Sequence, residues 1–170
     1  MVGYESRTAL RTEQPPLDVE RVCASLLAKG SLTSMLRALN ERTRFRFTGL
    51  YRVDPPLLRN LFLYDRENPT LNVSGGVSSL EDTYCALVWS EDRPFATPNS
   101  ASEPRLAAHA ARERVQSYCG VPIRSVSGLV WGTLCHHDVR PRLLPRWENL
   151  VLERVAALLA PIVTGATPVI

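Results

Sequence analysis

Two pairs of neighbouring segments, residues 44–65 and 117–138, place apolar and polar residues in alternation. In RFRFTGLYRVD (44–54) every second residue from Phe45 to Val53 shares one side of a strand, and a DPP turn leads into LLRNLFLYD (57–65). In the second pair, YCGVPIRS and GLVWGTLCHHD flank a turn at residues 126–128. This period of two limits the chain to folds that contain antiparallel hairpins.

Segments in which apolar residues have helical spacing lie before and after these hairpins in the sequence. Residues 17–28 and 31–42 each carry one apolar stripe, and residues 145–163 carry more apolar residues than one sheet face needs. The excess in the last segment indicates a partner helix. Hairpins and segregated helices together predict an α+β domain with a central antiparallel sheet.

The intervening segments are assigned by their capping and breaking residues. Residues 80–90 predict a short helix, because Ser79 can cap it and two acidic residues follow in its first turn. Residues 93–99 contain two prolines and predict an edge strand. The alanine- and arginine-rich residues 103–116 predict a further helix, and residues 67–79 predict a polar loop.

The length of 170 residues predicts one domain. We expect a flexible N-terminal arm at residues 1–16, a domain at 17–163 and a tail at 164–170. No signal peptide or membrane-spanning run is found, which favours a cytoplasmic protein with no membrane partner. The net charge of only +3 argues against a nucleic-acid partner.

The four cysteines occur without a secretory signal, which argues against a disulfide framework. They form no C-x-x-C pair, which argues against structural zinc. The hairpin turn places Cys119 roughly opposite residues 133–135, so its thiol is close to Cys135 if both face one side. With Cys85 added, three thiols would gather into a redox site. Alternatively, each cysteine is a small buried apolar residue.

His136 and His137 are adjacent, and neighbouring strand residues point to opposite faces. They therefore cannot chelate one metal from a regular strand, and no metal is expected. The alternation places His136 on the face of Leu134 and His137 on the face of Cys135.

The whole pattern resembles the GAF domain family, the small-molecule sensor module of signalling proteins. The segments that carry the resemblance are TYCALV (83–88), RPF (93–95), SYCGVPI (117–123) and GLVWGTLCHHD (128–138), together with the last helix. The resemblance implies a six-stranded antiparallel sheet, with terminal helices on one face and a ligand pocket on the other. It also implies that the first and last helices pack together and often mediate a homodimer.

Branches of the family narrow the expected cofactor. CHHDVRPR (135–142) is similar to a stretch of phytochrome-type GAF domains, but residues 102–114 contain no cysteine to attach a bilin, so no bilin is expected. Free methionine sulfoxide reductases of this family carry a catalytic cysteine in the loop before the Val-Pro strand. Residues 96–117 contain none, which argues against this enzyme.

Three functions remain open. The first is a non-enzymatic small-molecule sensor that acts through a dimer or a signalling partner in trans, with an unknown ligand. The second is a thiol-based redox sensor or reductase that uses Cys85, Cys119 and Cys135, and the third is a dimerisation module. The candidate ligand-binding residues are aromatic or polar side chains and thiols near the expected pocket: Thr83, Tyr84, Cys85, Trp89, Asn99, Tyr118, Cys119, Thr133, Cys135 and His136.

Overall fold

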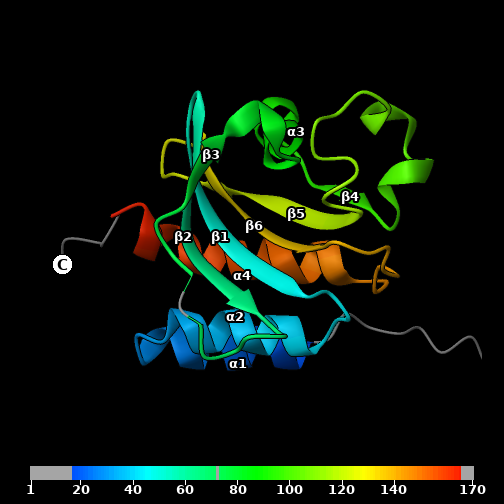
Figure 1. The fold of residues 1–170 in the computed structure, drawn as a ribbon. Helices are drawn as coiled ribbons and strands as arrows, with labels where there is room; N and C mark the ends of the chain where they lie inside the picture. The colour runs from blue at the N-terminus through cyan, green and yellow to red at the C-terminus, as the bar shows by residue number, and fades with distance from the viewer. Residues whose placement is uncertain (1–16, 72, 166–170) are drawn as a thin grey trace, which may run out of the picture.

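Six strands form one antiparallel sheet in the computed structural model, which describes residues 17–71 and 73–165 (Figure 1). The strands are β1 (Phe47–Asp54), β2 (Leu57–Asp65), β3 (Val77–Ser79), β4 (Phe95–Thr97), β5 (Ser117–Arg124) and β6 (Val130–Asp138). Their order across the sheet is β3-β2-β1-β6-β5-β4. The two predicted hairpins are therefore confirmed. The first strand of one hairpin, β1, pairs with the last strand of the other, β6, in the middle of the sheet.

Three helices form a layer on one face of the sheet, the first of them packed on the other two, and shorter elements cover the other face (Figure 1). The first group is α1 (Leu17–Ala28), α2 (Leu32–Glu41) and α4 (Glu148–Val163). The second group is α3 (Cys85–Glu91) and the 3-10 turns η1 (Leu80–Asp82), η2 (Ser100–Ser102) and η3 (Pro104–Leu106). The α+β class and the placement of the terminal helices on one face agree with the sequence-based prediction.

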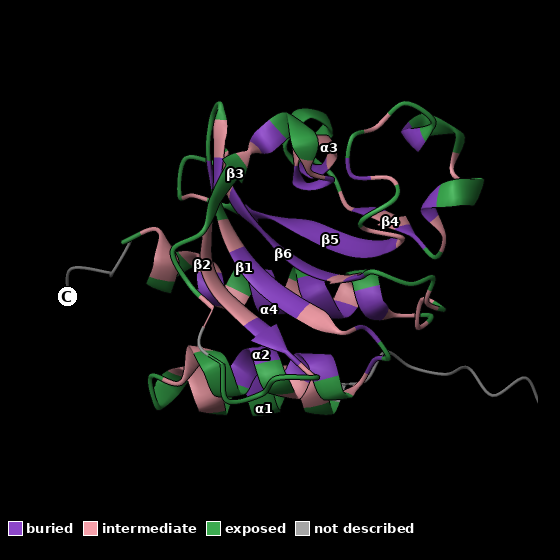
Figure 2. Cartoon of the chain, in the orientation of Figure 1, coloured by how far each residue is buried: buried purple, intermediate pink, exposed green. Residues whose placement is uncertain are grey.

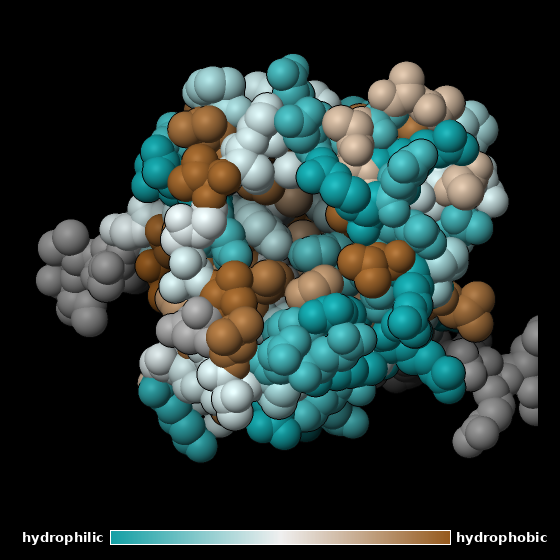
Figure 3. Space-filling model, viewed as in Figure 1, coloured by the Kyte–Doolittle hydropathy of each residue, from teal (hydrophilic) through white to brown (hydrophobic). Residues whose placement is uncertain are grey.

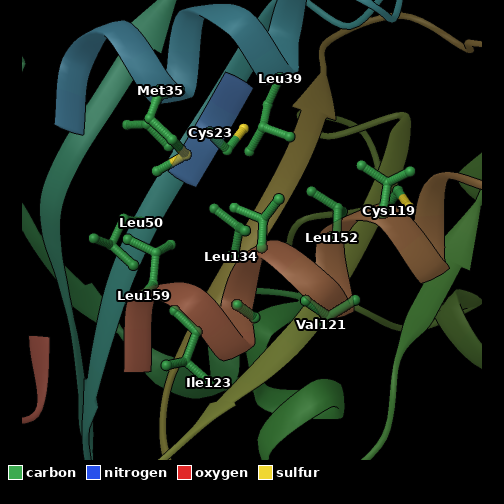
Figure 4. Close-up of a cluster of buried hydrophobic side chains, with 14 of the residues drawn as sticks. Cys23, Met35, Leu39, Leu50, Cys119, Val121, Ile123, Leu134, Leu152 and Leu159 are labelled. Atoms are coloured by element: carbon green, nitrogen blue, oxygen red, sulfur yellow. The ribbon is translucent and has the colours of Figure 1, made fainter. Parts of the chain in front are cut away.

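The main core lies between the sheet and the three long helices (Figure 4). The apolar stripe of α2 buries Met35 and Leu39, and α4 buries Leu152 and Leu159 against alternate residues of the central strands. The strand residues in this layer are Leu50, Val121, Ile123 and Leu134. Because β5 is covered on both faces, nearly its whole length is buried (Figure 2).

The segment from Glu103 to Gln116 corrects one sequence-based prediction. It contains only η3 and a series of turns instead of the predicted helix. The Arg112 guanidinium donates hydrogen bonds to the carbonyl oxygens of Ser100, Ala101 and Ala107, so tertiary contacts of this arginine outweigh the helix propensity of the alanines. The predicted loop at 67–79 also ends in the short strand β3.

The expected N-terminal arm lies outside the described residues, and of the expected tail only Thr164 and Gly165 are described. No described helix is both long enough and apolar enough to cross a membrane. On the face seen in Figure 3, hydrophobic residues lie in small groups among hydrophilic ones.

Candidate functional site

A cavity of about 340 Å³ lies between the sheet and the segments that cover its second face. Figure 3 shows a recess in this face of the molecule. The sheet contributes Tyr51, Leu58, Ser78, Ser79, Tyr118, Cys135 and His137 to the cavity wall. The covering segments contribute Asp82, Thr83, Tyr84, Cys85, Ala111, Arg114 and Val115. A volume of this size and a mixed aromatic and polar wall are typical of small-molecule sites.

Two glycines shape the floor of the cavity. Cys135 in β6 is paired with Gly49 in β1 on one side and with Gly120 in β5 on the other. Because neither glycine carries a side chain, the ring of Tyr51 lies over Gly49 and the ring of Tyr118 lies over Gly120. The two tyrosines therefore bend toward Cys135 from both neighbouring strands.

Cys85, the first residue of α3, faces this floor. Its Sγ accepts a hydrogen bond from Thr133 Oγ1 at 3.2 Å and lies 3.4 Å from the Tyr118 hydroxyl oxygen. Interaction with the Cys135 thiol, and then with the Thr133 and Tyr118 hydroxyls, outweighs the cost of burial and lowers the pKa of Cys85 to about 7. Burial, together with the neighbouring Cys85, raises the pKa of Cys135 well above its usual value.

His137 closes one side of the cavity. Its Nε2 lies 3.1 Å from the Tyr51 hydroxyl oxygen, and its ring stacks on Phe47 at a centroid distance of 4.9 Å. Burial, with a smaller contribution from His136, lowers the pKa of His137 to about 4. The imidazole is therefore neutral near pH 7 and can both donate and accept a hydrogen bond at the cavity.

Tyr84 anchors the covering segments to the sheet. Its hydroxyl donates a hydrogen bond to the Val115 carbonyl oxygen at 2.8 Å. Its ring meets the edge of Tyr118 at a centroid distance of 5.6 Å and also contacts Phe95 and His109. Tyr84 thus connects Val115 and His109 of the covering segments to Tyr118 of β5 and Phe95 of β4.

Six of the ten predicted residues gather at this site. Thr83, Tyr84, Cys85, Tyr118 and Cys135 line the cavity, and Thr133 contacts it through Cys85. Trp89 is 39% exposed and lines a separate surface groove, while the Asn99 side chain caps the turn η2. Cys119 and His136 lie on the helix-covered face of the sheet.

The register of the β5–β6 hairpin separates Cys119 from the other thiols. Arg124 pairs with Val130 and Ile123 pairs with Gly132, so Trp131 is the extra residue of a β-bulge. The bulge moves the pairing by one residue, and Cys119 pairs with His136, outside the predicted range of 133–135. The alternative in which three thiols gather is therefore wrong for Cys119, whose thiol donates to Asn149 Oδ1 of α4 at 2.9 Å.

His136 connects the sheet to the start of α4. Thr48 Oγ1 accepts a hydrogen bond from the Asn40 side chain and lies 2.7 Å from His136 Nδ1. Because Thr48 Oγ1 already accepts from Asn40, its hydroxyl donates to His136 Nδ1. The ring proton is then on Nε2, which donates to Glu148 Oε1 at 3.0 Å. The Arg42 guanidinium donates to the same carboxylate, so the charge of the buried Glu148 is paired.

Sequence reasoning missed several cavity residues. Tyr51 shares the face of Gly49 and Val53, and His137 was placed on the face of Cys135, so strand alternation could have added both. Asp82, Arg114 and Val115 come from irregular segments, where no periodicity indicates the direction of a side chain. Within the described residues, no three histidine, cysteine, aspartate or glutamate side chains are close enough to hold a metal ion.

Comparisons with known proteins agree with this architecture. The family model of the GAF domain matches residues 7–163. A search of curated proteins finds no match.

Among solved structures, the GAF domain of an Acinetobacter phosphoenolpyruvate-protein phosphotransferase has a TM-score of 0.70 and 18% identity, covering 90% of this chain and 95% of that one. The free methionine-R-sulfoxide reductase of Neisseria meningitidis has a TM-score of 0.66 and 18% identity, and the match covers 84% of each chain. The chromophore-binding domain of a Stigmatella aurantiaca bacteriophytochrome has a TM-score of 0.64 and 13% identity, and the match covers 86% of this chain and 59% of that one. At these identities the likeness shows the fold alone.

Proposed function

Because this chain belongs to the GAF domain family, we propose that it is a regulatory sensor domain that binds a small molecule between the sheet and α3. The observation that carries the proposal is the cavity of about 340 Å³ beside Cys85, Tyr118 and His137. Sensing is a common role of the family, whereas the ligand has to follow from the cavity itself.

The walls favour a small, largely apolar or aromatic ligand with a few polar groups. Three tyrosine rings supply flat apolar surface, and Leu58, Ala111 and Val115 add aliphatic contacts. Asp82 and Arg114 in the cover and the neutral His137 in the sheet supply directed polar contacts. A ligand with one hydrogen-bonding end and an aromatic or aliphatic body fits this distribution best.

Ligand binding would first change the conformation of residues 111–115, which cover the cavity and have no regular secondary structure. Residues 111–115 are connected by turns, and their carbonyl groups accept hydrogen bonds from the hydroxyls of Ser100 and Tyr84. Contacts with a ligand would therefore favour one arrangement of this segment. The opposite face of β6 carries His136, which contacts Glu148 at the start of α4. This gives a physical connection between the cavity floor and the terminal helices.

We further propose that α1 and α4 present the readout surface, through a homodimer or a signalling partner in trans. Val22 of α1 is 48% exposed and Ile162 of α4 is 53% exposed. Sedimentation velocity of the full chain tests the homodimer, and a monomer at micromolar concentration would favour a partner in trans.

The test of ligand binding uses a cavity-filling variant. Ala111→Trp places an indole into the cavity, because Ala111 is buried in its wall, whereas Ala110→Trp changes the exposed neighbour in the same segment. A small-molecule library is screened by thermal unfolding of the full chain under reducing conditions. We expect hits to raise the melting temperature of the wild type and of the Ala110 variant but not of the Ala111 variant.

Native mass spectrometry of the same samples measures stoichiometry. One bound molecule per chain, absent in Ala111→Trp, supports the proposal. Hits that stabilise all three proteins equally bind elsewhere and would contradict it. The melting curve of the unliganded Ala111 variant shows whether this variant is folded.

A further inference from the structure

Two of the four cysteines share the wall of the cavity although they are 50 residues apart in the chain. Cys85 comes from α3 and Cys135 from the central strand β6, and both thiols are free. Cys85 Sγ lies 3.2 Å from Thr133 Oγ1, and Thr133 is two residues before Cys135 on the same face of β6. Cys85 Sγ also lies 3.4 Å from the hydroxyl oxygen of Tyr118, whose ring covers Gly120, the strand partner of Cys135. The two thiols therefore lie in the same part of the cavity wall.

The two thiols differ in the way that a redox pair requires. Cys85 accepts the Thr133 hydrogen bond and interacts with the Cys135 thiol, so its thiolate form is stabilised and its pKa is lowered to about 7. Cys135 is fully buried, and its raised pKa keeps it protonated. One member is thus a nucleophile near neutral pH and the other is a protonated thiol that can react with an oxidised Cys85.

We propose that Cys85 and Cys135 form a reversible intramolecular disulfide when a hydroperoxide enters the cavity. The inference goes beyond the sensor function, because it holds whether or not the cavity also binds a separate ligand. It assigns a modification site to the cavity wall, with hydroperoxides as the oxidant class and small dithiols as the reductant class.

The chemistry balances in two steps. The Cys85 thiolate attacks one peroxide oxygen, the O–O bond breaks, and the leaving alkoxide takes a proton from water to become an alcohol, which leaves Cys85 as a sulfenic acid. The Cys135 sulfur then attacks the Cys85 sulfur, the S–O bond breaks, and the hydroxide leaves with the Cys135 proton as water. The peroxide gains the two electrons that the thiol pair loses, and an external dithiol returns them.

The groups around Cys85 support the first step and come from every element packed against it. Thr83 precedes α3, Tyr118 lies on β5, and Thr133 and Cys135 lie on β6. Tyr51 on β1 and the neutral His137 line the same cavity, and the charged groups in its wall are Asp82 and Arg114. The pKa values of Tyr51 and Tyr118 are raised by burial, so both stay protonated as potential hydrogen-bond donors.

The other two cysteines are internal controls. Cys119 lies on the opposite sheet face with its pKa raised by burial, and burial raises the pKa of Cys23 to about 11 within the helical layer. Neither lines the cavity. Both should stay reduced while the cavity pair reacts.

The first experiment uses the wild-type full chain. Reduced protein is treated with hydrogen peroxide, remaining thiols are alkylated, and trypsin digestion is followed by mass spectrometry without reduction. An arginine or lysine lies between every two consecutive cysteines, so each cysteine falls on its own peptide. We expect a mass loss of two hydrogens, a crosslink between the Cys85 and Cys135 peptides, and full recovery of both thiols with a dithiol.

Single serine variants then test the order of events. Cys135→Ser should accumulate the Cys85 sulfenic acid, trapped by dimedone as an adduct on the Cys85 peptide, whereas Cys119→Ser should form the disulfide like the wild type. The wild-type peptide map remains decisive even if a serine variant fails to fold.

Two results would overturn the proposal. One is that all four thiols stay reduced while glutathione in the same tube is oxidised. The other is a crosslink that includes Cys23 or Cys119, or that joins two chains. Binding hits that disappear in the Ala111→Trp variant test the sensor function separately, so failure of one proposal leaves the other measurable.

Discussion

The phenol ring of Tyr118 lies over Gly120, in the space where a residue with a side chain would place its Cβ atom. Gly120 is also the β5 partner of Cys135, so the ring that fills the space over the glycine lies beside the cysteine on the cavity side. The position of the Tyr118 hydroxyl beside Cys85 therefore depends on the absence of a side chain two residues further along the same strand.

Gly120→Ala should displace the Tyr118 ring and destabilise the domain. Forcing one methyl group into a packed layer typically costs about 1–3 kcal/mol, which chemical denaturation can measure. Gly76→Ala is the matched control, because its added Cβ would meet only Asn60 Cβ at 3.9 Å. Equal stability of the two variants would show that the ring moves aside at little cost.

Glu148→Ala should be one of the most destabilising polar substitutions in the described chain. The carboxylate is 1% exposed and pairs with both Arg42 and His136, so its removal leaves two buried or half-buried partners without their acceptor. We expect a loss of about 3–5 kcal/mol in the free energy of unfolding. Glu41→Ala removes the exposed pair with Arg37 and should cost less than about 1 kcal/mol; similar losses would contradict the assigned role of the buried network.

His137 should titrate far below the ordinary histidine range. Burial lowers its pKa from 6.5 to about 4, so in proton NMR its imidazole signal should stay constant until the pH approaches 4. Between pH 6.5 and 4 the unfolded chain binds a proton at this residue and the folded chain does not, so His137 makes stability decrease as the pH falls through this window. The variant His137→Gln should flatten that part of the stability profile, and an NMR midpoint near 6.5 would contradict the burial effect.

Thr133→Val should make Cys85 less reactive at pH 7. The substitution keeps the shape of the side chain but removes the hydrogen bond to Cys85 Sγ, so the pKa of Cys85 rises and less thiolate is present. Alkylation by iodoacetamide, followed on the Cys85 peptide, should slow by about sevenfold, because a hydrogen bond to a charged group contributes at least about 1.5 kcal/mol and this raises the pKa by about one unit.

The matched control for this measurement is Thr97→Val, the same change at another buried strand threonine, which contacts Asn99 and not Cys85. Unchanged alkylation rates in both variants would show that Thr133 does not stabilise the thiolate.

Periodicity was sufficient to predict most of the framework. The hairpins at 44–65 and 117–138 and the three long helices follow from the regular spacing of the apolar residues that they place in the core. The region of 103–116 could not be predicted in this way, since its conformation depends on the contacts of Arg112 with carbonyl groups that are distant in the chain. Helix propensity is a property of single residues and takes no account of such contacts.

The candidate site was predictable to the extent that strand alternation was regular. Tyr118, Cys135 and the opposite directions of His136 and His137 follow from a period of two. The bulge at Trp131 shifts the register by one residue and carries Cys119 away from Cys135. Gly132 follows the bulge, but Gly120 also lies within a strand, so a glycine alone does not locate the bulge. A single inserted residue therefore decides which thiols can meet.

The cover between β4 and β5 closes on itself at its base. The backbone amide of Ser100 donates to the Gln116 carbonyl oxygen at 2.8 Å, and the Ser100 hydroxyl donates to the Arg112 carbonyl oxygen at 2.7 Å. The intervening residues thus form a compact loop whose two ends are held together by hydrogen bonds. This loop contributes Ala111, Arg114 and Val115 to the cavity wall. A loop of another length or composition between the same two ends would therefore change what the cavity recognises, while the sheet and the helical layer keep their sequence.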